Sequence, residues 1–376
     1  MPARDIETIY RLAPMQEGML FHSLSDPELG LYVEQAACVL EGEIDAAGLR
    51  RAWERVVAHH PALRASFHWR EVERPVQVIH RAVAVPWREE DWRGGAAGGA
   101  LSPEAEAARF GALLEADRRR GFDLERAPLL RLTLLRTGPR RWRFLWSYHH
   151  LLLDGWSLFP VLRQVFDAYG AAAAGAEPEL PRARPYVDYI AWLEARDTPA
   201  ERERDEAVWR RELGGFRSAT PLPGARPGAA GRGGRGALRA RPATGTRGRT
   251  LSRELSAAVE ELAGRAGVTS GTVLQGAWAL LLARAAGEDD VVFGTVVSGR
   301  PAHLAGADSM VGLFVNTLPV RVRIDEEEPV APWLRRLQGR LAELREHEHS
   351  PLARVHRWSG VEPGEPLFES LVAFEN

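Results

Sequence analysis

The chain has 376 residues, of which 45% are hydrophobic and 27% charged, and its formal net charge is −2. This composition is typical of a globular protein, and the length exceeds a single ordinary core, so we expect two lobes. The near-neutral charge argues against nucleic acid or an anionic membrane as a partner.

Three further features exclude classes of protein. Cys38 is the one cysteine, which excludes a disulfide framework and a cysteine-based zinc site and fits a reducing compartment. The N-terminus lacks the basic-then-apolar pattern of a signal peptide, and no apolar run approaches the roughly 20 residues of a membrane span. We therefore expect a cytoplasmic protein.

Helix and strand signals alternate through the first half of the chain. Residues 45–60 have apolar side chains at helical spacing, and Asp45 is placed to cap that helix. Pro61 ends it, and the following "ALRASFHW" is typical of a strand. Ser102 and Pro103 predict the start of another helix, because serine is a favoured N-cap and proline fits the first helical position.

Two strand-like runs, residues 129–136 and 141–150, flank a short turn around Gly138, which predicts a hairpin. Alternate residues of a strand point to opposite faces. In the second run the aromatic residues share one face, and His150 continues that face, which we expect to be buried. His149 falls on the opposite face, so the two histidines cannot share one role.

The remaining elements follow in the same alternating order. Ser157 is placed to cap a helix over residues 158–175, with Pro160 tolerated in its first turn. Residues 214–250 are rich in Gly and Arg and predict a solvated loop between the lobes. The second half predicts, in order, helices over residues 252–267 and 268–287 that end at Gly267 and Gly287, strands over 289–297 and 316–324, and an amphipathic helix over 331–347.

The stretch "HHLLLDG", residues 149–155, allows four interpretations. The first is structural: a buried, hydrogen-bonded histidine that only ends a strand. A zinc site is the second, but adjacent histidines point to opposite strand faces and no other His, Asp or Glu cluster has suitable spacing, so we expect no metal. A Ser-His-Asp hydrolase is the third, and it would need a G-x-S-x-G turn that the sequence lacks.

The fourth interpretation is general base catalysis without a protein nucleophile. His150 at a strand end would take a proton from an amine or hydroxyl as that group attacks an acyl donor. Asp154 would hold the loop and the imidazole. Gly155 would allow close backbone approach, so that its N–H faces the developing oxyanion, and the following helix start favours negative charge.

The same stretch, followed by "WS", resembles the HHxxxDG block of condensation domains from nonribosomal peptide synthetases. Four other stretches resemble blocks of that family: "LAPMQEGMLFHSL" (residues 12–24), "HHPALRASF" (59–67, with His59 in place of the usual arginine), "YVDYIAW" (186–192) and "VGLFVNTLPVR" (311–321). Their order and spread cover nearly the whole chain.

This resemblance implies an α/β fold of two chloramphenicol-acetyltransferase-like lobes, arranged as a V-shaped pseudo-dimer with a tunnel at their junction. It implies that a donor acyl or peptidyl thioester is attacked by the amine of an acceptor aminoacyl thioester, with both substrates on 4'-phosphopantetheine arms of peptidyl carrier proteins and no cofactor bound directly. An adjoining adenylation domain is the other implied partner. His150 either deprotonates the amine or orients it and stabilises the tetrahedral intermediate.

The resemblance also implies roles for other residues. Asp154 should pair with an arginine, and Arg64 is the first candidate and Arg300 the second. Each arginine could equally be an ordinary surface residue.

Five more residues are supporting or tunnel candidates. Asn316 either contacts the pantetheine arm or braces the junction of the lobes, and Gln16 is expected near the tunnel. Trp156 and Ser157 are expected to be a packing residue and a helix cap. His149 is expected to turn into the core as a hydrogen-bonding spacer.

The expected domains are an N-terminal lobe over residues 1–180, an inter-lobe helix and Gly/Arg-rich loop over 181–250, and a C-terminal lobe over 251–376. The family's last block is absent after "LFESLVAFEN", so we expect the second lobe to lack its final segment. Two other functions stay open. One is a stand-alone HxxxD acyltransferase that acts on a free alcohol or amine, and the other is a non-catalytic recruitment domain.

Overall fold

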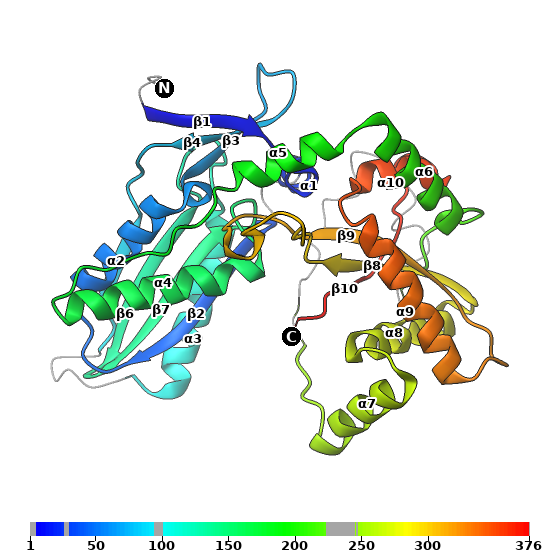
Figure 1. The fold of residues 1–376 in the computed structure, drawn as a ribbon. Helices are drawn as coiled ribbons and strands as arrows, with labels where there is room; N and C mark the ends of the chain where they lie inside the picture. Colours follow the sequence, from blue (N-terminus) through cyan, green and yellow to red (C-terminus); the bar gives the residue numbers. More distant parts are fainter. Residues whose placement is uncertain (1–4, 26–29, 94–100, 223–244, 246, 376) are drawn as a thin grey trace. The chain divides into compact units, whose positions relative to one another are not determined.

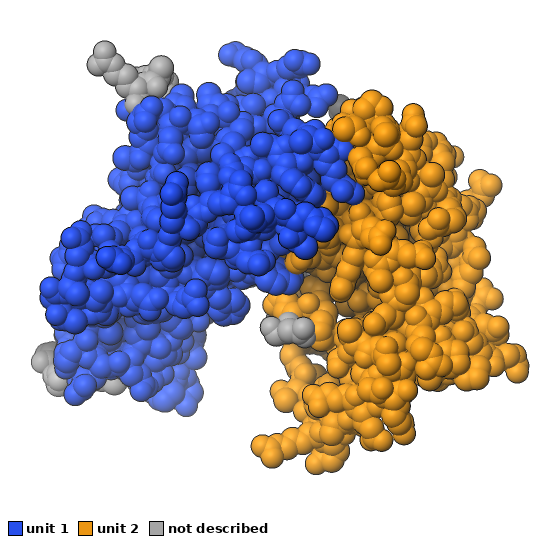
Figure 2. Space-filling view, in the orientation of Figure 1, with its two compact units in different colours: residues 1–196, 300–314 blue, residues 197–299, 315–376 orange. Residues whose placement is uncertain are grey.

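The protein is described from a computed structural model. The structure describes all residues except 1–4, 26–29, 94–100, 223–244, 246 and 376. The chain forms two compact units, coloured separately in Figure 2. The first unit contains residues 1–196 and 300–314, and the second contains residues 197–299 and 315–376.

The first unit consists of two sheets with helices packed on them (Figure 1). Its elements are β1 (Ile6–Arg11), α1 (Pro14–Ser25), β2 (Val33–Glu41), α2 (Ala46–His59), the 3₁₀ helix η3 (Pro61–Arg64), β3 (Ala65–His68), β4 (Val76–His80), β5 (Trp87–Asp91), α3 (Pro103–Arg120), β6 (Leu130–Gly138), β7 (Arg141–His149), α4 (Gly155–Ala173), α5 (Val187–Arg196) and the 3₁₀ helix η5 (Ala307–Ser309).

The larger sheet of this unit has the strand order β2-β7-β6-β5, and the smaller has the order β1-β4-β3. β6 and β7 form the predicted antiparallel hairpin, and β2 pairs with β7 from Glu41–Arg141 to Val33–His149. β5 pairs with β6 in parallel. β7 is therefore a central strand, and its last residue is His149.

Both faces of β7 are covered by helices. On one face, the ring of Trp53 from α2 lies 4.8 Å from that of Trp146 and 5.7 Å from that of Phe144. On the other face, Leu145 packs in a cluster with Phe110 of α3. A strand covered on both sides is buried along its length, so the predicted aromatic face of β7 is buried but so is most of the opposite face.

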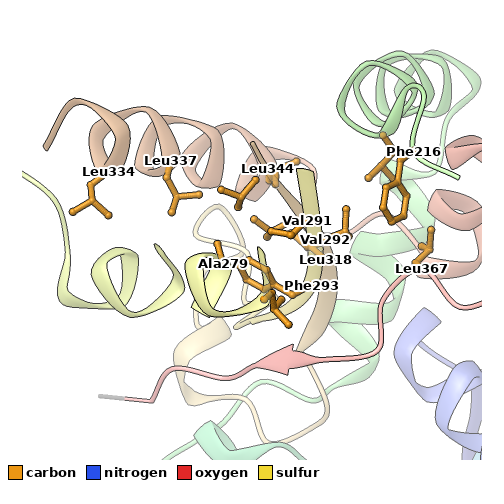
Figure 3. Close-up of a cluster of buried hydrophobic side chains, with 14 of the residues drawn as sticks. Phe216, Ala279, Val291, Val292, Phe293, Leu318, Leu334, Leu337, Leu344 and Leu367 are labelled. Carbon is orange, nitrogen blue, oxygen red and sulfur yellow. The ribbon is translucent and has the colours of Figure 1, made fainter. Parts of the chain in front are cut away.

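The second unit has a three-stranded sheet in the order β10-β8-β9. Its elements are α6 (Pro199–Leu213), α7 (Arg253–Ala266), α8 (Ser270–Ala286), β8 (Asp290–Val297), β9 (Asn316–Arg323), α9 (Val330–Glu346), α10 (Leu352–Ser359) and β10 (Leu371–Val372). The core lies between the sheet and the helices, where Phe293, Leu318 and Leu337 are among the buried side chains (Figure 3).

Most predicted elements are confirmed. Ser102 caps α3 by accepting from the N–H of Ala105, and Gly267 and Gly287 end α7 and α8 in the left-handed conformation. The strand predicted for "ALRASFHW" is wrong in its first part, because residues 61–64 form η3 and the strand begins only at Ala65.

The two units also divide the chain elsewhere than we expected. α5 belongs to the first unit, and so does the segment 300–314, which follows β8 of the second unit in the chain. The reason is local bonding, because Arg300 and the backbone of residues 312–314 contact residues of α4 and the loop before it. The Gly/Arg-rich residues 223–244 and 246 lie outside the described residues.

Among the described residues, no single helix has both the length and the apolar composition of a membrane span. α7 and α8 pass that test only as a pair, and they are bent by 102°.

Candidate active site

The loop between β7 and α4 is anchored by its apolar residues. Leu151, Leu152 and Leu153 are each 1% exposed or less. The carbonyl of Leu151 accepts from the side-chain amide of Gln16 at 2.9 Å. The apolar run in "HHLLLDG" thus anchors the loop in the core and fixes the residues on either side of it.

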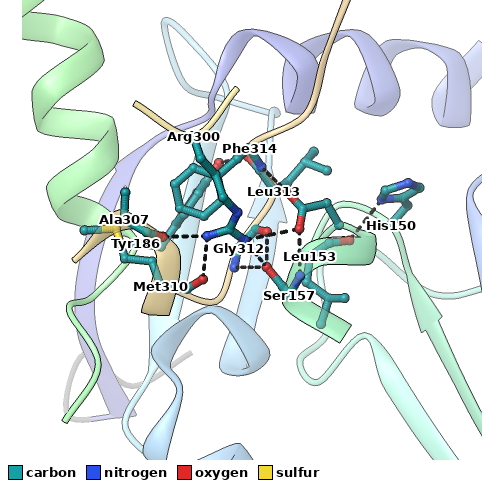
Figure 4. A network of polar contacts seen from close by, with 11 residues as sticks. His150, Leu153, Ser157, Tyr186, Arg300, Ala307, Met310, Gly312, Leu313 and Phe314 are labelled. Carbon is teal, nitrogen blue, oxygen red and sulfur yellow. Dashed lines mark hydrogen bonds and ion pairs between the residues drawn. The ribbon is translucent and has the colours of Figure 1, made fainter. Parts of the chain in front are cut away.

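His150 is the first residue of this loop, and its ring is partly exposed. Our prediction that it continues the buried face of the strand is wrong, because the strand ends at His149 and the alternation ends with it. Nδ1 of His150 lies 2.9 Å from the carbonyl oxygen of Leu153 (Figure 4). A carbonyl can only accept, so the proton of the neutral ring is on Nδ1 and the lone pair is on Nε2. Within the part of the chain that the structure describes, Nε2 has no hydrogen-bond partner.

His149 is buried, with 3% of its surface exposed. Its Nδ1 accepts from the backbone N–H of Leu151 at 3.2 Å, and its Nε2 lies 3.5 Å from Oγ of Ser23. Burial and the neighbouring His150 lower the pKa of His149 to about 3, so this ring is neutral at pH 7. The structure agrees with the role of a hydrogen-bonding spacer in the core.

Asp154 is fully buried and organises the start of α4 (Figure 4). As N-cap, its Oδ1 accepts from the N–H of Ser157 at 2.9 Å and from Nη2 of Arg300 at 3.3 Å. Its Oδ2 accepts from the N–H of Phe314 at 2.9 Å, and its own N–H donates to the carbonyl of Gly312 at 3.2 Å. The carboxylate therefore holds the loop, as expected, but the group that holds the imidazole is the carbonyl of Leu153.

The partner of Asp154 is Arg300, the second candidate, and not Arg64. The guanidinium of Arg300 donates to the carbonyls of Ala307 and Met310 at 2.6 and 3.0 Å and lies 4.1 Å from the ring centre of Phe314. The pair Asp154–Arg300 is buried and has many neutral partners, which is the arrangement that a buried ion pair requires.

Arg64 is buried elsewhere in the first unit. Its guanidinium donates to the carboxylate of Glu7 at 2.7 Å, to the carbonyl of His80 and to the carbonyl of Arg81. It thus ties η3 to the β1–β4 sheet. Its position close to a family block in the sequence does not reveal this partner.

Ser157 is fully buried and bonds to a segment distant in sequence. Its Oγ donates to the carbonyl of Gly312 at 2.9 Å and accepts from Nη2 of Arg300 at 2.8 Å. Our prediction that Ser157 is the helix cap is wrong, because α4 begins two residues earlier and Asp154 caps it. The packing role predicted for Trp156 is also wrong, since 41% of that side chain is exposed.

Gly155 is the first residue of α4 and is exposed. Its N–H belongs to the first helical turn, whose N–H groups have no carbonyl partner within the helix and attract negative charge. The position is therefore compatible with the expected contact to an oxyanion.

Gln16 and Asn316 are both buried in scaffolding contacts. The side chain of Gln16 accepts from the N–H of Ala13 and bonds to Leu151, so it holds α1 to the loop and is 1% exposed. Asn316, at the start of β9 in the second unit, donates to the carbonyls of Glu348 and Ser350 at 2.7 and 3.0 Å. A pantetheine contact for either residue stays a prediction.

Sequence reasoning misses the backbone of residues 312–314 as a partner of Asp154 and Ser157, because it selects only Asn316 from the block "VGLFVNT". The hydroxyl of Tyr186 donates to the carbonyl of Leu313, and a Cβ on Gly312 would lie 2.1 Å from the Tyr186 ring. The signal for this contact is the co-occurrence of "YVDYIAW" and a glycine in that block, because only glycine allows the ring to approach so closely.

The arrangement provides one partly exposed proton acceptor on a fixed loop. The described residues contain no group of three or more His, Cys, Asp or Glu side chains that could hold a metal ion. A neutral imidazole with its Nδ1–H bonded to a carbonyl presents Nε2 as a base. The site can thus assist a proton transfer without a covalent intermediate.

Comparison with known proteins agrees with this geometry. Residues 6–376 match the condensation domain family. The chain is 35% identical over 376 residues to bacitracin synthase 3 of Bacillus licheniformis, covering 99% of this chain and 6% of that protein. It is 34% identical over 375 residues to bacitracin synthase 1 of the same organism, covering 100% of this chain and 7% of that protein. The chain thus spans under a tenth of the length of these relatives.

Solved structures show the same fold. The first condensation domain of the calcium-dependent antibiotic synthetase, in complex with a substrate analogue, has a TM-score of 0.76 at 23% identity, covering 98% of this chain and 80% of that one. A variant of the starter condensation domain of rhizomide synthetase has a TM-score of 0.78 at 22% identity, covering 97% and 78%. The mixed α/β fold expected from the sequence is confirmed, and the chain belongs to the condensation domain family of nonribosomal peptide synthetases.

Proposed function

We propose that the protein forms an amide bond between a donor acyl or peptidyl thioester and the amine of an acceptor aminoacyl thioester. Both substrates would be carried on the phosphopantetheine arms of carrier proteins. The observation that carries this proposal is the partly exposed ring of His150, with its Nδ1 bonded to Leu153 and its Nε2 available. Membership of the condensation domain family supports the choice of reaction.

In the proposed step the acceptor amine nitrogen attacks the thioester carbon of the donor. The C–N bond forms, the C–S bond breaks, and the donor arm leaves as a thiol. Nε2 of His150 accepts a hydrogen bond from the amine, and the proton passes through it to the leaving sulfur. A base role and an orienting role both require Nε2 as the acceptor, so both depend on the tautomer set by Leu153.

The residues around His150 would act as positioning residues. Asp154 and Arg300 hold the loop through buried contacts and do not touch the imidazole. The N–H of Gly155, at the start of α4, would stabilise the negative charge that develops on the carbonyl oxygen.

The proposed partners are a donor and an acceptor peptidyl carrier protein and an adjoining adenylation domain. Relatives such as bacitracin synthase 3 are many times longer than this chain, which supports a multidomain context.

The test is single-turnover amide formation from loaded donor and acceptor carriers. For His150→Ala we expect a rate at least about 100-fold below that of the wild type, because a positioned base contributes that much or more. The thermal midpoint should stay near that of the wild type, since the ring is partly exposed. His303→Ala, which alters an exposed histidine of the same unit, is the control and should keep the wild-type rate.

Other outcomes would point to the other functions. Turnover of a free amine or alcohol without an acceptor carrier would favour a stand-alone acyltransferase. Normal binding of both carriers with no bond formed by the wild type would favour a recruitment domain. An unchanged rate for His150→Ala would contradict the assignment of His150.

A further inference from the structure

Tyr32 has a backbone conformation that tyrosine rarely adopts. It lies in the turn before β2, where the N–H of Val33 donates to the carbonyl of Gly30 at 3.4 Å, and its φ is 61°. Positive φ at the third residue of a turn is normally taken by glycine, because a side chain there crowds the backbone. Among the described residues, Glu71 is the other non-glycine residue with positive φ. Residues held in such conformations concentrate at functional sites.

The backbone of Tyr32 contacts His150 directly. The N–H of His150 donates to the carbonyl oxygen of Tyr32 at 2.8 Å. The last paired residues of β2 and β7 are Val33 and His149, so this bond lies one residue beyond the ladder. The turn at Tyr32 therefore determines where the peptide of His150 leaves the strand.

The side chain of Tyr32 contacts two other histidines. Its hydroxyl shares a hydrogen bond of 2.8 Å with Nδ1 of His22 in α1, and the two rings are nearly parallel with centres 6.3 Å apart. The ring of His149 also lies 6.3 Å away. The tyrosine ring thus connects α1 to the end of β7, and these contacts hold the turn in its strained conformation.

We propose that Tyr32 is a positioning residue for His150, because its ring contacts with His22 and His149 fix the turn whose carbonyl binds the His150 peptide. This inference rests on the proposed function of His150. A glycine at position 32 would adopt the same φ without strain but would lack the ring. Stability and activity should therefore respond in opposite ways to that change.

The test compares Tyr32→Gly with Glu71→Gly, which relieves positive φ in an exposed turn. For Tyr32→Gly we expect an unchanged or higher thermal midpoint and single-turnover amide formation about 10-fold slower at saturating carriers. The KM for the acceptor carrier should not change, and deuterium exchange at the His150 amide should become faster. Glu71→Gly should match the wild type in rate, KM and exchange.

Tyr32→Phe keeps the ring and removes only the hydroxyl, so it serves if the glycine variant does not fold. We expect for it a smaller loss of rate, about 2- to 5-fold, with faster exchange at the His150 amide. A wild-type rate and wild-type exchange in both Tyr32 variants would overturn the proposal, as would a change in KM alone. An inactive wild type would refute the proposed function, and the exchange comparison would still decide whether Tyr32 positions His150.

Discussion

His149 and His150 are adjacent in the chain but carry their ring protons on different nitrogens. Nδ1 of His149 accepts from Leu151, which leaves its proton on Nε2, whereas Nδ1 of His150 donates to Leu153. One ring is buried and structural, and the other is partly exposed with an available acceptor. The pairing of two histidines in the sequence thus reflects two different roles.

Burial of His149 predicts a loss of stability in acid. The pKa of His149 is lowered to about 3 in the folded protein, mainly by burial, against about 6.5 in an unfolded chain. Above pH 6.5 neither state binds the proton, and below it only the unfolded state does, so stability is lost as the pH falls from 6.5 towards 3. By pH 5 this histidine alone should cost about 2 kcal/mol.

Urea unfolding at pH 7.5 and pH 5 measures this effect. His149→Gln should lose about 2 kcal/mol less than the wild type between the two pH values, whatever its stability at pH 7.5. His303→Gln, at an exposed position, should lose as much as the wild type. Equal losses in wild type and His149→Gln would show that His149 is not buried as a neutral ring.

The sequence predicts that the two histidines differ but assigns the buried face to the wrong one. Strand alternation places neighbouring side chains on opposite faces, and that rule holds as far as His149. It cannot show where a strand ends, because the last paired residue depends on the partner strand, here Val33 of β2.

At the scale of elements, Asp154 joins the start of α4 to a segment that is distant in the chain. It bonds to Ser157 of its own helix and to Arg300 and Phe314 of the segment 300–314. All of these contacts are buried, so the carboxylate has no water to replace a lost partner.

We expect Asp154→Ala to lower the free energy of unfolding by about 3 to 5 kcal/mol, because it leaves the charge of Arg300 buried without a partner. Glu115→Ala is the control, since it removes an exposed ion pair with Arg119 and should cost less than about 0.5 kcal/mol. Urea unfolding of both variants gives the comparison. A loss below about 1 kcal/mol for Asp154→Ala would show that the network does not hold this loop.

Elements with strong local signals can be predicted from the sequence, and their partners cannot. The β6–β7 hairpin and the glycine-capped helices α7 and α8 are predictable because their turn and cap residues are local. The strand β5 escapes prediction, since residues 87–91 are largely polar and the strand lies at the edge of its sheet. The choice of Arg300 over Arg64 depends on contacts between distant segments, which periodicity does not report.

At the scale of the whole molecule, the chain returns from the second unit to the first at residues 300–314. That segment supplies Arg300 and the backbone groups that Asp154 binds. The two-lobe organisation is predictable from length and family blocks, but this return is not, because the segment shows no change of composition at its ends. The loop that presents His150 therefore depends on residues from distant parts of the sequence.

The central claim is that this fold presents Nε2 of His150 as an available proton acceptor. Nitrogen-15 NMR of the histidine rings in the full chain at pH 8.5, assigned with His150→Gln and His149→Gln, measures it directly. The account predicts a protonated Nδ1 and an unprotonated Nε2 for His150, with the reverse for His149. A protonated Nε2 in His150 would contradict it.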